Sequence, residues 1–67
     1  MDLQLNGRSY RTSFDSGTLA TLLEELDRHP RTVAIELNGE IVPRANFAEQ
    51  PVRPGDRIEI VQFVQGG

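Results

Sequence analysis

The sequence contains no cysteine, a single histidine, and no run of apolar residues long enough to cross a bilayer. Without cysteine there is no disulfide, thiol nucleophile or thiolate metal site, and one imidazole cannot form a metal cluster. A membrane-spanning helix needs about 18 or more apolar residues. Since no charged-then-apolar leader opens the chain either, the sequence predicts a cytoplasmic protein that crosses no membrane.

Lysine is also absent, so all seven basic residues are arginine, against ten acidic residues and a net charge of −3. Codon bias is the simpler explanation for the absence of lysine. The functional alternative is that such a chain has no ε-amine that its own carboxyl terminus, once activated, could acylate by mistake. The arginines are interspersed with acidic residues, whereas nucleic-acid binding depends on clustered positive charge. The sequence therefore predicts no nucleic-acid partner.

The length of 67 residues allows one domain, 1–67, with one small core. Domains of this size bury only about 60% of the surface that the unfolded chain exposes, so deep pockets are scarce. The sequence also shows no nucleophile–base pair. We therefore expect a protein that is not an enzyme in its own right.

A hairpin is predicted at the start of the chain. Leu3-Gln4-Leu5 alternates apolar and polar residues, as a half-buried strand does. Asn6-Gly7 follows, a dipeptide typical of two-residue turns with positive φ at both positions. The chain then returns over Ser9–Phe14, with three side chains on one face: Tyr10, Thr12 and Phe14.

One helix is predicted from about Thr18 to Arg28. Asp15-Ser16-Gly17-Thr18 supplies a turn and an N-cap, and Pro30 ends the helix because proline has no amide hydrogen to donate. Four leucines recur at i, i+3, i+4 and i+7 and form one core-facing stripe: Leu19, Leu22, Leu23 and Leu26.

The second half of the chain predicts three strands and one irregular stretch. Alternation defines a strand over Val33–Leu37, and the last and longest strand runs from Arg57 to Val64. Between them lie a turn at Asn38-Gly39, a short strand at Ile41-Val42 closed by Pro43, an irregular or single-turn helical stretch over Ala45–Gln50 anchored by Phe47, and a turn at Pro54-Gly55-Asp56.

This order of elements favours an α+β fold. A hairpin followed by one helix leaves a right-handed crossover to a later strand. The most economical arrangement places the first and last strands side by side and parallel at the centre of a mixed sheet. One sheet face then carries the covering helix and the other lies open, which is the ubiquitin-like β-grasp architecture.

The side-chain pattern of the last strand predicts a docking surface on the open face. Ile58 and Ile60 share one strand face, and Val61 and Phe63 share the other. If the isoleucines face the helix, the second pair is exposed, and exposed apolar side chains suggest a partner-docking patch. The alternative is a bulge or strand end that turns the second pair back toward the core.

The chain finishes at Gly66-Gly67, within an expected flexible tail over 64–67. A terminal carboxylate is an anion at neutral pH and a poor electrophile, so it reacts only after activation, commonly as a mixed anhydride with AMP. This chain has no phosphate-binding loop. We therefore expect no bound cofactor and a partner that uses ATP and magnesium. Two glycines would let the terminus thread a narrow channel; the alternative is a frayed tail without function.

Three segments together resemble a known family. Leu37–Arg44 (Leu-Asn-Gly-Glu-Ile-Val-Pro-Arg), Pro54–Val61 and Gly66-Gly67 are similar to the sulfur carriers of thiamine biosynthesis, the ThiS family. The resemblance spans the whole chain, and its most discriminating element is the Asn-Gly-Glu-Ile-Val-Pro-Arg stretch combined with the diglycine. It implies a carrier that is monomeric alone.

The resemblance also implies partners and roles. An adenylyltransferase similar to ubiquitin-activating enzymes would adenylate the carboxylate of Gly67, and Gly66 would give it access. A persulfide donor, a cysteine desulfurase or a related protein, would convert the carboxylate to a thiocarboxylate. Thiazole synthase would then take the sulfur into the thiazole ring. The expected partner interface comprises Val61, Phe63, Val64 and Gln65.

Several alternatives remain at this point. The small subunit of molybdopterin synthase shares the fold and the diglycine end, although such relatives usually run longer. A carrier for tRNA thiolation, a ubiquitin-like modifier, and a β-grasp interaction module without covalent chemistry are further possibilities. Arg44 either pairs with a partner protein or a phosphate, or is a solvated loop arginine.

Overall fold

The computed structural model describes residues 1–63 and begins with the predicted hairpin. Strand β1 (Asp2–Leu5) pairs antiparallel with β2 (Arg8–Arg11). Asn6 and Gly7 join them with φ values of 50° and 79°, the positive angles that a type I′ turn requires at both central positions. The hairpin prediction is confirmed.

The second strand is shorter than predicted, because it ends at Arg11 rather than Phe14. The ladder with β1 stops there, and one more backbone bond follows, from the Thr12 N–H to the Met1 carbonyl at 2.9 Å. The chain then leaves the sheet for the helix. The three side chains expected on one face are all buried or half-buried: Tyr10, Thr12 and Phe14.

Helix α1 (Leu19–Glu25) begins where the sequence predicts. Thr18 is the N-cap: its Oγ1 accepts from the Thr21 N–H, while the Thr21 Oγ1 accepts from the Thr18 N–H at 3.0 Å. This reciprocal capping box satisfies two amides that would otherwise lack helical partners. The predicted leucine stripe faces the core, with Leu19, Leu22 and Leu23 buried and Leu26 packed beside them.

The helix ends at Glu25, earlier than the predicted Arg28. Asp27 adopts a φ of 57°, and the Arg28 N–H bonds back to the Leu23 carbonyl at 2.9 Å. This is the bonding of a Schellman motif, with Asp27 in the left-handed position that glycine usually occupies. The prediction that Pro30 ends the helix is therefore wrong, and this proline instead opens a separate 3₁₀ turn.

The second half of the chain follows the predicted order. The 3₁₀ helix η1 (Pro30–Thr32) leads into β4 (Val33–Leu37), a tight turn, β5 (Glu40–Val42) and a second 3₁₀ helix, η2 (Arg44–Asn46). Phe47, which follows η2, is buried as expected. The last strand is β7 (Arg57–Gln62); the predicted continuation to Val64 lies outside the described residues.

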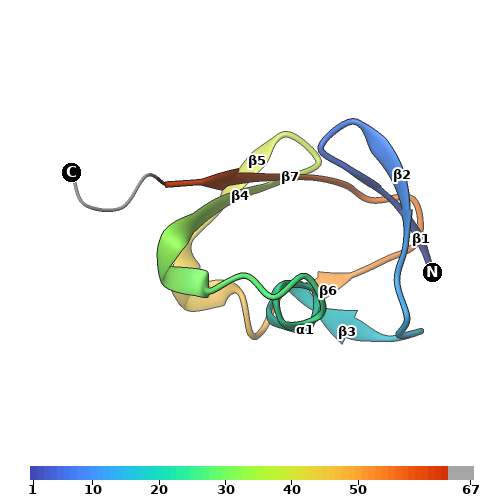
Figure 1. Ribbon diagram of the computed structural model, residues 1–67, viewed down its shortest axis with the longest axis horizontal. Coiled ribbons are helices and arrows are strands. Elements are labelled where there is room, and N and C mark those ends of the chain that lie inside the picture. The colour runs from blue at the N-terminus through green and yellow to red at the C-terminus, as the bar shows by residue number, and fades with distance from the viewer. Residues whose placement is uncertain (64–67) are drawn as a thin grey trace.

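A small second sheet was not predicted. Strand β3 (Gly17–Thr18) pairs antiparallel with β6 (Pro51–Val52), and these strands flank the start of α1. Each has two residues, too few for a periodicity to be recognised. In Figure 1 this pair lies with α1 beneath the large sheet, on the same side.

The large sheet has the strand order β2-β1-β7-β4-β5, with β1 and β7 parallel and every other neighbouring pair antiparallel. The first and last strands are thus adjacent in the middle of a mixed sheet, as predicted. Figure 1 shows α1 packed under one face of that sheet while the opposite face carries no element among residues 1–63. The architecture is the predicted β-grasp.

The core lies between this sheet and α1. It is made of nine buried apolar side chains, drawn from both halves of the chain: Leu3, Leu19, Leu22, Leu23, Val33, Ile35, Phe47, Val52 and Ile58. Burying a leucine- or isoleucine-sized side chain contributes roughly 1.5–3 kcal/mol. The start of β7 is therefore fixed by burial at Ile58, which positions the residues that follow it.

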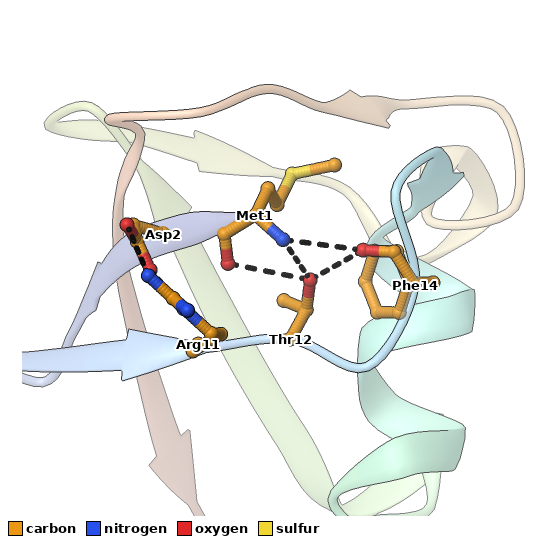
Figure 2. Close-up of polar contacts among 5 residues, drawn as sticks. All are labelled: Met1, Asp2, Arg11, Thr12 and Phe14. Carbon is orange, nitrogen blue, oxygen red and sulfur yellow. Dashed lines mark hydrogen bonds and ion pairs between the residues drawn. The ribbon is translucent and has the colours of Figure 1, made fainter.

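A polar cluster closes the end of the sheet where the chain begins (Figure 2). The Met1 ammonium donates to the Thr12 Oγ1 at 2.9 Å and to the Phe14 carbonyl at 3.3 Å, and the Thr12 hydroxyl donates to that same carbonyl at 2.6 Å. Beside it, Arg11 and Asp2 form an exposed ion pair at 2.9 Å. The guanidinium of Arg11 lowers the pKa of the Asp2 carboxyl, first by hydrogen bonding and then by its charge.

Candidate functional site

Strand β7 divides its side chains between the two faces of the sheet. Ile58 is 1% exposed and Ile60 is half-buried against the core, whereas Val61 is 59% exposed and Phe63 is 44% exposed. Successive side chains of a strand point to opposite faces, so Val61 and Phe63 share the open face. We call these two residues the tail-side patch, because they precede the C-terminal segment.

The pairing of β7 with β4 is regular. Each residue from Ile58 to Gln62 faces one residue of β4, from Leu37↔Ile58 to Val33↔Gln62. A bulge would place two residues of one strand against one of the other. The alternative in which a bulge or the strand end returns Val61 and Phe63 to the core is therefore wrong, because the pairing is regular as far as Gln62 and both side chains are exposed.

The end of β7 is held by contacts from three other segments. The Asn6 side chain, in the β1–β2 turn, accepts from the Ile60 N–H at 2.8 Å and donates to the Ile60 carbonyl at 3.3 Å. The Arg28 Nη1, after the helix, donates to the Gln62 Oε1 at 2.7 Å. The Phe63 N–H donates to the carbonyl of Thr32, the last residue of η1, at 2.8 Å.

The open face is acidic beside the tail-side patch. Glu36 of β4 and Glu59 of β7 are both exposed and stand directly opposite each other, next to the Ala34↔Val61 pair. Like charges placed directly opposite in a sheet destabilise it. A partner that presents apolar and basic side chains would therefore complement this part of the face.

The carboxylate of Glu25, in α1, joins the helix to β2 and to the segment after it. Glu25 accepts from the Tyr10 hydroxyl, from the Ser13 hydroxyl, and from the Ser13 N–H at 3.0 Å. These donors, the Ser13 hydroxyl first, lower the pKa of Glu25, while the bond to Glu25 raises the pKa of Tyr10. This cluster links two elements of the fold and lies outside the tail-side patch.

The predicted site residues fall into two groups. Val61 and Phe63 lie together on the open face as expected. Val64, Gln65, Gly66 and Gly67 lie outside the described residues. Arg44, whose role the sequence left open, is exposed at the start of η2.

Two residues of the region were missed by the sequence analysis. Ile41 is 76% exposed and faces Glu36 across β4 and β5, so it shares the open face. A signal existed, because a two-residue turn at Asn38-Gly39 fixes that pairing and Glu36 is a solvent-facing residue. Asn6 was assigned only a turn, and no sequence pattern shows that its side chain bonds to a strand more than fifty residues away.

Residues 1–63 contain neither a metal-binding cluster nor a membrane-spanning helix. Among them, no three His, Asp or Glu side chains come together in a way that could hold a metal ion. Within the same residues, no helix is long and apolar enough to span a membrane.

The comparisons with known proteins agree with this geometry. The model of the ThiS family matches residues 3–67. The sulfur carrier protein ThiS of Bacillus subtilis (strain 168) is 38% identical over 65 residues, which cover 97% of this chain and 98% of that protein. A crystal structure of the thiamine biosynthesis protein ThiS from Geobacter metallireducens matches with a TM-score of 0.84 and 33% identity, over the full length of both chains.

A larger relative matches over part of its length. The thiazole synthase of Paramagnetospirillum magneticum is 45% identical over all 67 residues of this chain. The chain spans only 20% of that protein, however. A stretch similar to this whole chain is therefore one segment of a longer polypeptide there.

Proposed function

Because the chain belongs to the ThiS family, we propose that it is a sulfur carrier for thiazole formation in thiamine biosynthesis. The observation that carries the proposal is the family match over residues 3–67, which includes both the tail-side patch and the diglycine. The relative from Bacillus subtilis, similar over almost its entire length, carries the name sulfur carrier protein.

In this proposal Gly67 is the reacting residue. A partner similar to ubiquitin-activating enzymes uses ATP and magnesium to convert the Gly67 carboxylate to an acyl adenylate, and pyrophosphate leaves. The sulfur of a protein persulfide then attacks the acyl carbon, and AMP leaves. A thiol cleaves the resulting acyl disulfide, so that the thiocarboxylate remains on Gly67. The catalytic groups belong to the partners, and this chain supplies the acyl group and its delivery.

The tail-side patch is the proposed docking surface. Val61 and Phe63 are exposed apolar side chains, and association gains free energy when such surface is removed from water. Val64 and Gln65 extend the interface, and Gly66 admits the chain to a narrow site. Glu36 and Glu59 add negative charge beside the patch, which favours a partner with basic side chains.

Thiazole synthase is the proposed acceptor of the sulfur. The protein of that name in Paramagnetospirillum magneticum contains a stretch similar to this entire chain. Joining two modules in one polypeptide raises the effective concentration of each for the other. That arrangement supports a functional link between this carrier and a thiazole synthase.

Intact mass spectrometry tests the proposal. The chain is incubated with ATP, magnesium, a sulfide source and a ubiquitin-activating-like adenylyltransferase. We expect a mass gain equal to the replacement of one oxygen by sulfur, and no gain after deletion of Gly67. Glu49→Ala, an exposed change in the segment after η2, is the control and should be converted like the original chain.

Absence of both thiocarboxylate and adenylate would contradict the carrier role and favour a non-covalent interaction module. If the thiocarboxylate forms, sulfur transfer from the purified thiocarboxylate separates a role with thiazole synthase from a role with molybdopterin synthase. Transfer to thiazole synthase supports the proposal, whereas transfer only to molybdopterin synthase would contradict the thiazole assignment.

A further inference from the structure

Strand β7 extends beyond the strand that pairs with it on one side. The parallel ladder between β1 and β7 comprises Gln4↔Arg57 and Leu5↔Ile58, because β1 ends at Leu5. On the other side, β4 accompanies β7 as far as Gln62. The last residues of β7 therefore have a strand neighbour along one edge, while the other edge depends on different contacts.

The backbone groups of Ile60 point toward the edge that β1 has left. The Asn38 N–H bonds to the Arg57 carbonyl at 2.7 Å, and the Phe63 N–H bonds to the Thr32 carbonyl at 2.8 Å. In antiparallel pairs the hydrogen-bonded positions recur at every second residue. Odd-numbered residues of β7 therefore bond toward β4, and even-numbered residues such as Ile60 bond toward the β1 side.

Asn6 continues the ladder with its side chain. Its own N–H donates to the Ile58 carbonyl at 2.9 Å, as a further strand residue would. Its amide group then bonds to both backbone groups of Ile60, at 2.8 and 3.3 Å. One primary amide thus offers an acceptor and a donor where β1 no longer supplies a backbone.

Arg28 makes the next contact along the same strand. Its guanidinium bonds to the Gln62 side chain at 2.7 Å, from the turn that closes α1. Asn6 and Arg28 thus hold two alternate residues of β7, Ile60 and Gln62. The tail-side patch occupies the intervening and following positions, Val61 and Phe63.

We propose that Asn6 is a positioning residue for the carrier reaction, with Arg28 in support. The two residues bond to β7 as far as its last residue, Gln62. They therefore fix the docking surface relative to the point where the chain continues toward Gly67. A covalent step depends on placement of the reacting atoms, and displacement by about 1 Å can reduce a rate by as much as 100-fold. This inference rests on the proposed function.

The decisive variant is Asn6→Gly, which removes both side-chain bonds to Ile60 and tolerates the φ of 50°. Its matched control is Asn38→Gly in the other Asn-Gly turn. Asn38 has a φ of 54° and its Oδ1 accepts from the Arg57 N–H at 2.8 Å, so it makes a similar contact at the opposite end of β7.

The rate of adenylation by the partner enzyme, measured at varied concentrations of the chain, separates a positioning role of Asn6 from a general effect on stability. Docking on Val61 and Phe63 should persist in both variants, so KM should stay within about twofold. We expect kcat to fall about tenfold in Asn6→Gly and to stay within about twofold in Asn38→Gly. Asn6→Asp keeps the acceptor for the Ile60 N–H and should recover part of kcat.

Amide hydrogen exchange on the isolated chain provides a second readout. In Asn6→Gly we expect faster exchange at Ile60 and Phe63 and unchanged exchange at the core residue Ile35. If Asn6→Gly does not fold, Arg28→Ala takes its place as the test variant. It removes the bond to Gln62, leaves the backbone of the turn intact, and should also lower kcat.

The outcomes are distinguishable. An unchanged kcat in Asn6→Gly, or an equal loss in Asn6→Gly and Asn38→Gly, would overturn the positioning role while the carrier function stands. If the original chain forms no adenylate or thiocarboxylate at all, the proposed function fails, and the positioning role fails with it.

Discussion

The hydroxyl of Thr12 connects the start of the chain to the segment that follows β2. It accepts from the Met1 ammonium and donates to the Phe14 carbonyl, and the residue is only 6% exposed. Thr12→Val keeps the shape but removes both bonds, which leaves the Met1 ammonium and the Phe14 carbonyl only their mutual bond at 3.3 Å. We expect a loss of about 1–3 kcal/mol in the free energy of unfolding, measured by urea denaturation.

Thr12→Ser is the matched control. It keeps the hydroxyl and removes one methyl group, so its loss should be about 0.8 kcal/mol. If the valine variant were as stable as the serine variant, the hydroxyl network would not contribute to stability.

Between elements, Glu25 connects the segment after β2 to α1 and makes stability depend on pH. The Ser13 and Tyr10 donors lower the pKa of Glu25 below its ordinary value of 4.5 in the folded state. The unfolded chain therefore binds this proton more readily. The stability that Glu25 supplies is complete above pH 4.5 and is lost as the pH falls through the lower folded-state pKa.

We expect Glu25→Gln to flatten the fall of the free energy of unfolding between about pH 5 and about pH 2, measured by urea denaturation across that range. The double variant Ser13→Ala with Tyr10→Phe removes the side-chain donors but keeps the carboxylate. It should flatten the same region in part, and an unchanged slope in both variants would contradict this role of Glu25.

The elements also show what the sequence could predict. Long periodic segments were assigned correctly, because burial of alternate or i, i+3, i+4 residues leaves a pattern in the sequence. The end of α1 was missed, since the Schellman motif there uses Asp27 in a conformation typical of glycine. The β3–β6 pair was missed because its stability comes from tertiary contacts of two-residue strands.

The candidate site was predictable to a similar extent. Alternation along one strand was enough to predict that Val61 and Phe63 are exposed, and their exposed fractions confirm the prediction. The contacts of Asn6 and Arg28 with β7 could not be predicted, because they join residues that are far apart in the sequence. Such contacts depend on the packed fold rather than on any local pattern.

For the molecule as a whole, the fold presents one open face among residues 1–63, and the proposed docking surface lies at one end of it. Val61 and Ile41 are both exposed β-branched residues of that face, but Val61 is on the central strand that continues to the tail and Ile41 is on the edge strand β5. Val61→Ser should therefore raise KM for adenylation about tenfold with little change in kcat, because it removes docking surface and leaves the strand end held.

Ile41→Ser is the matched comparison and should raise KM by no more than about twofold, since Ile41 lies away from the strand that precedes the proposed reacting terminus. Both variants should keep the free energy of unfolding within about 0.5 kcal/mol, because neither side chain is buried. An equal rise in KM for the two variants would show that partners bind across the whole open face. A fall in kcat for Val61→Ser would instead assign Val61 to the positioning of the terminus, together with Asn6.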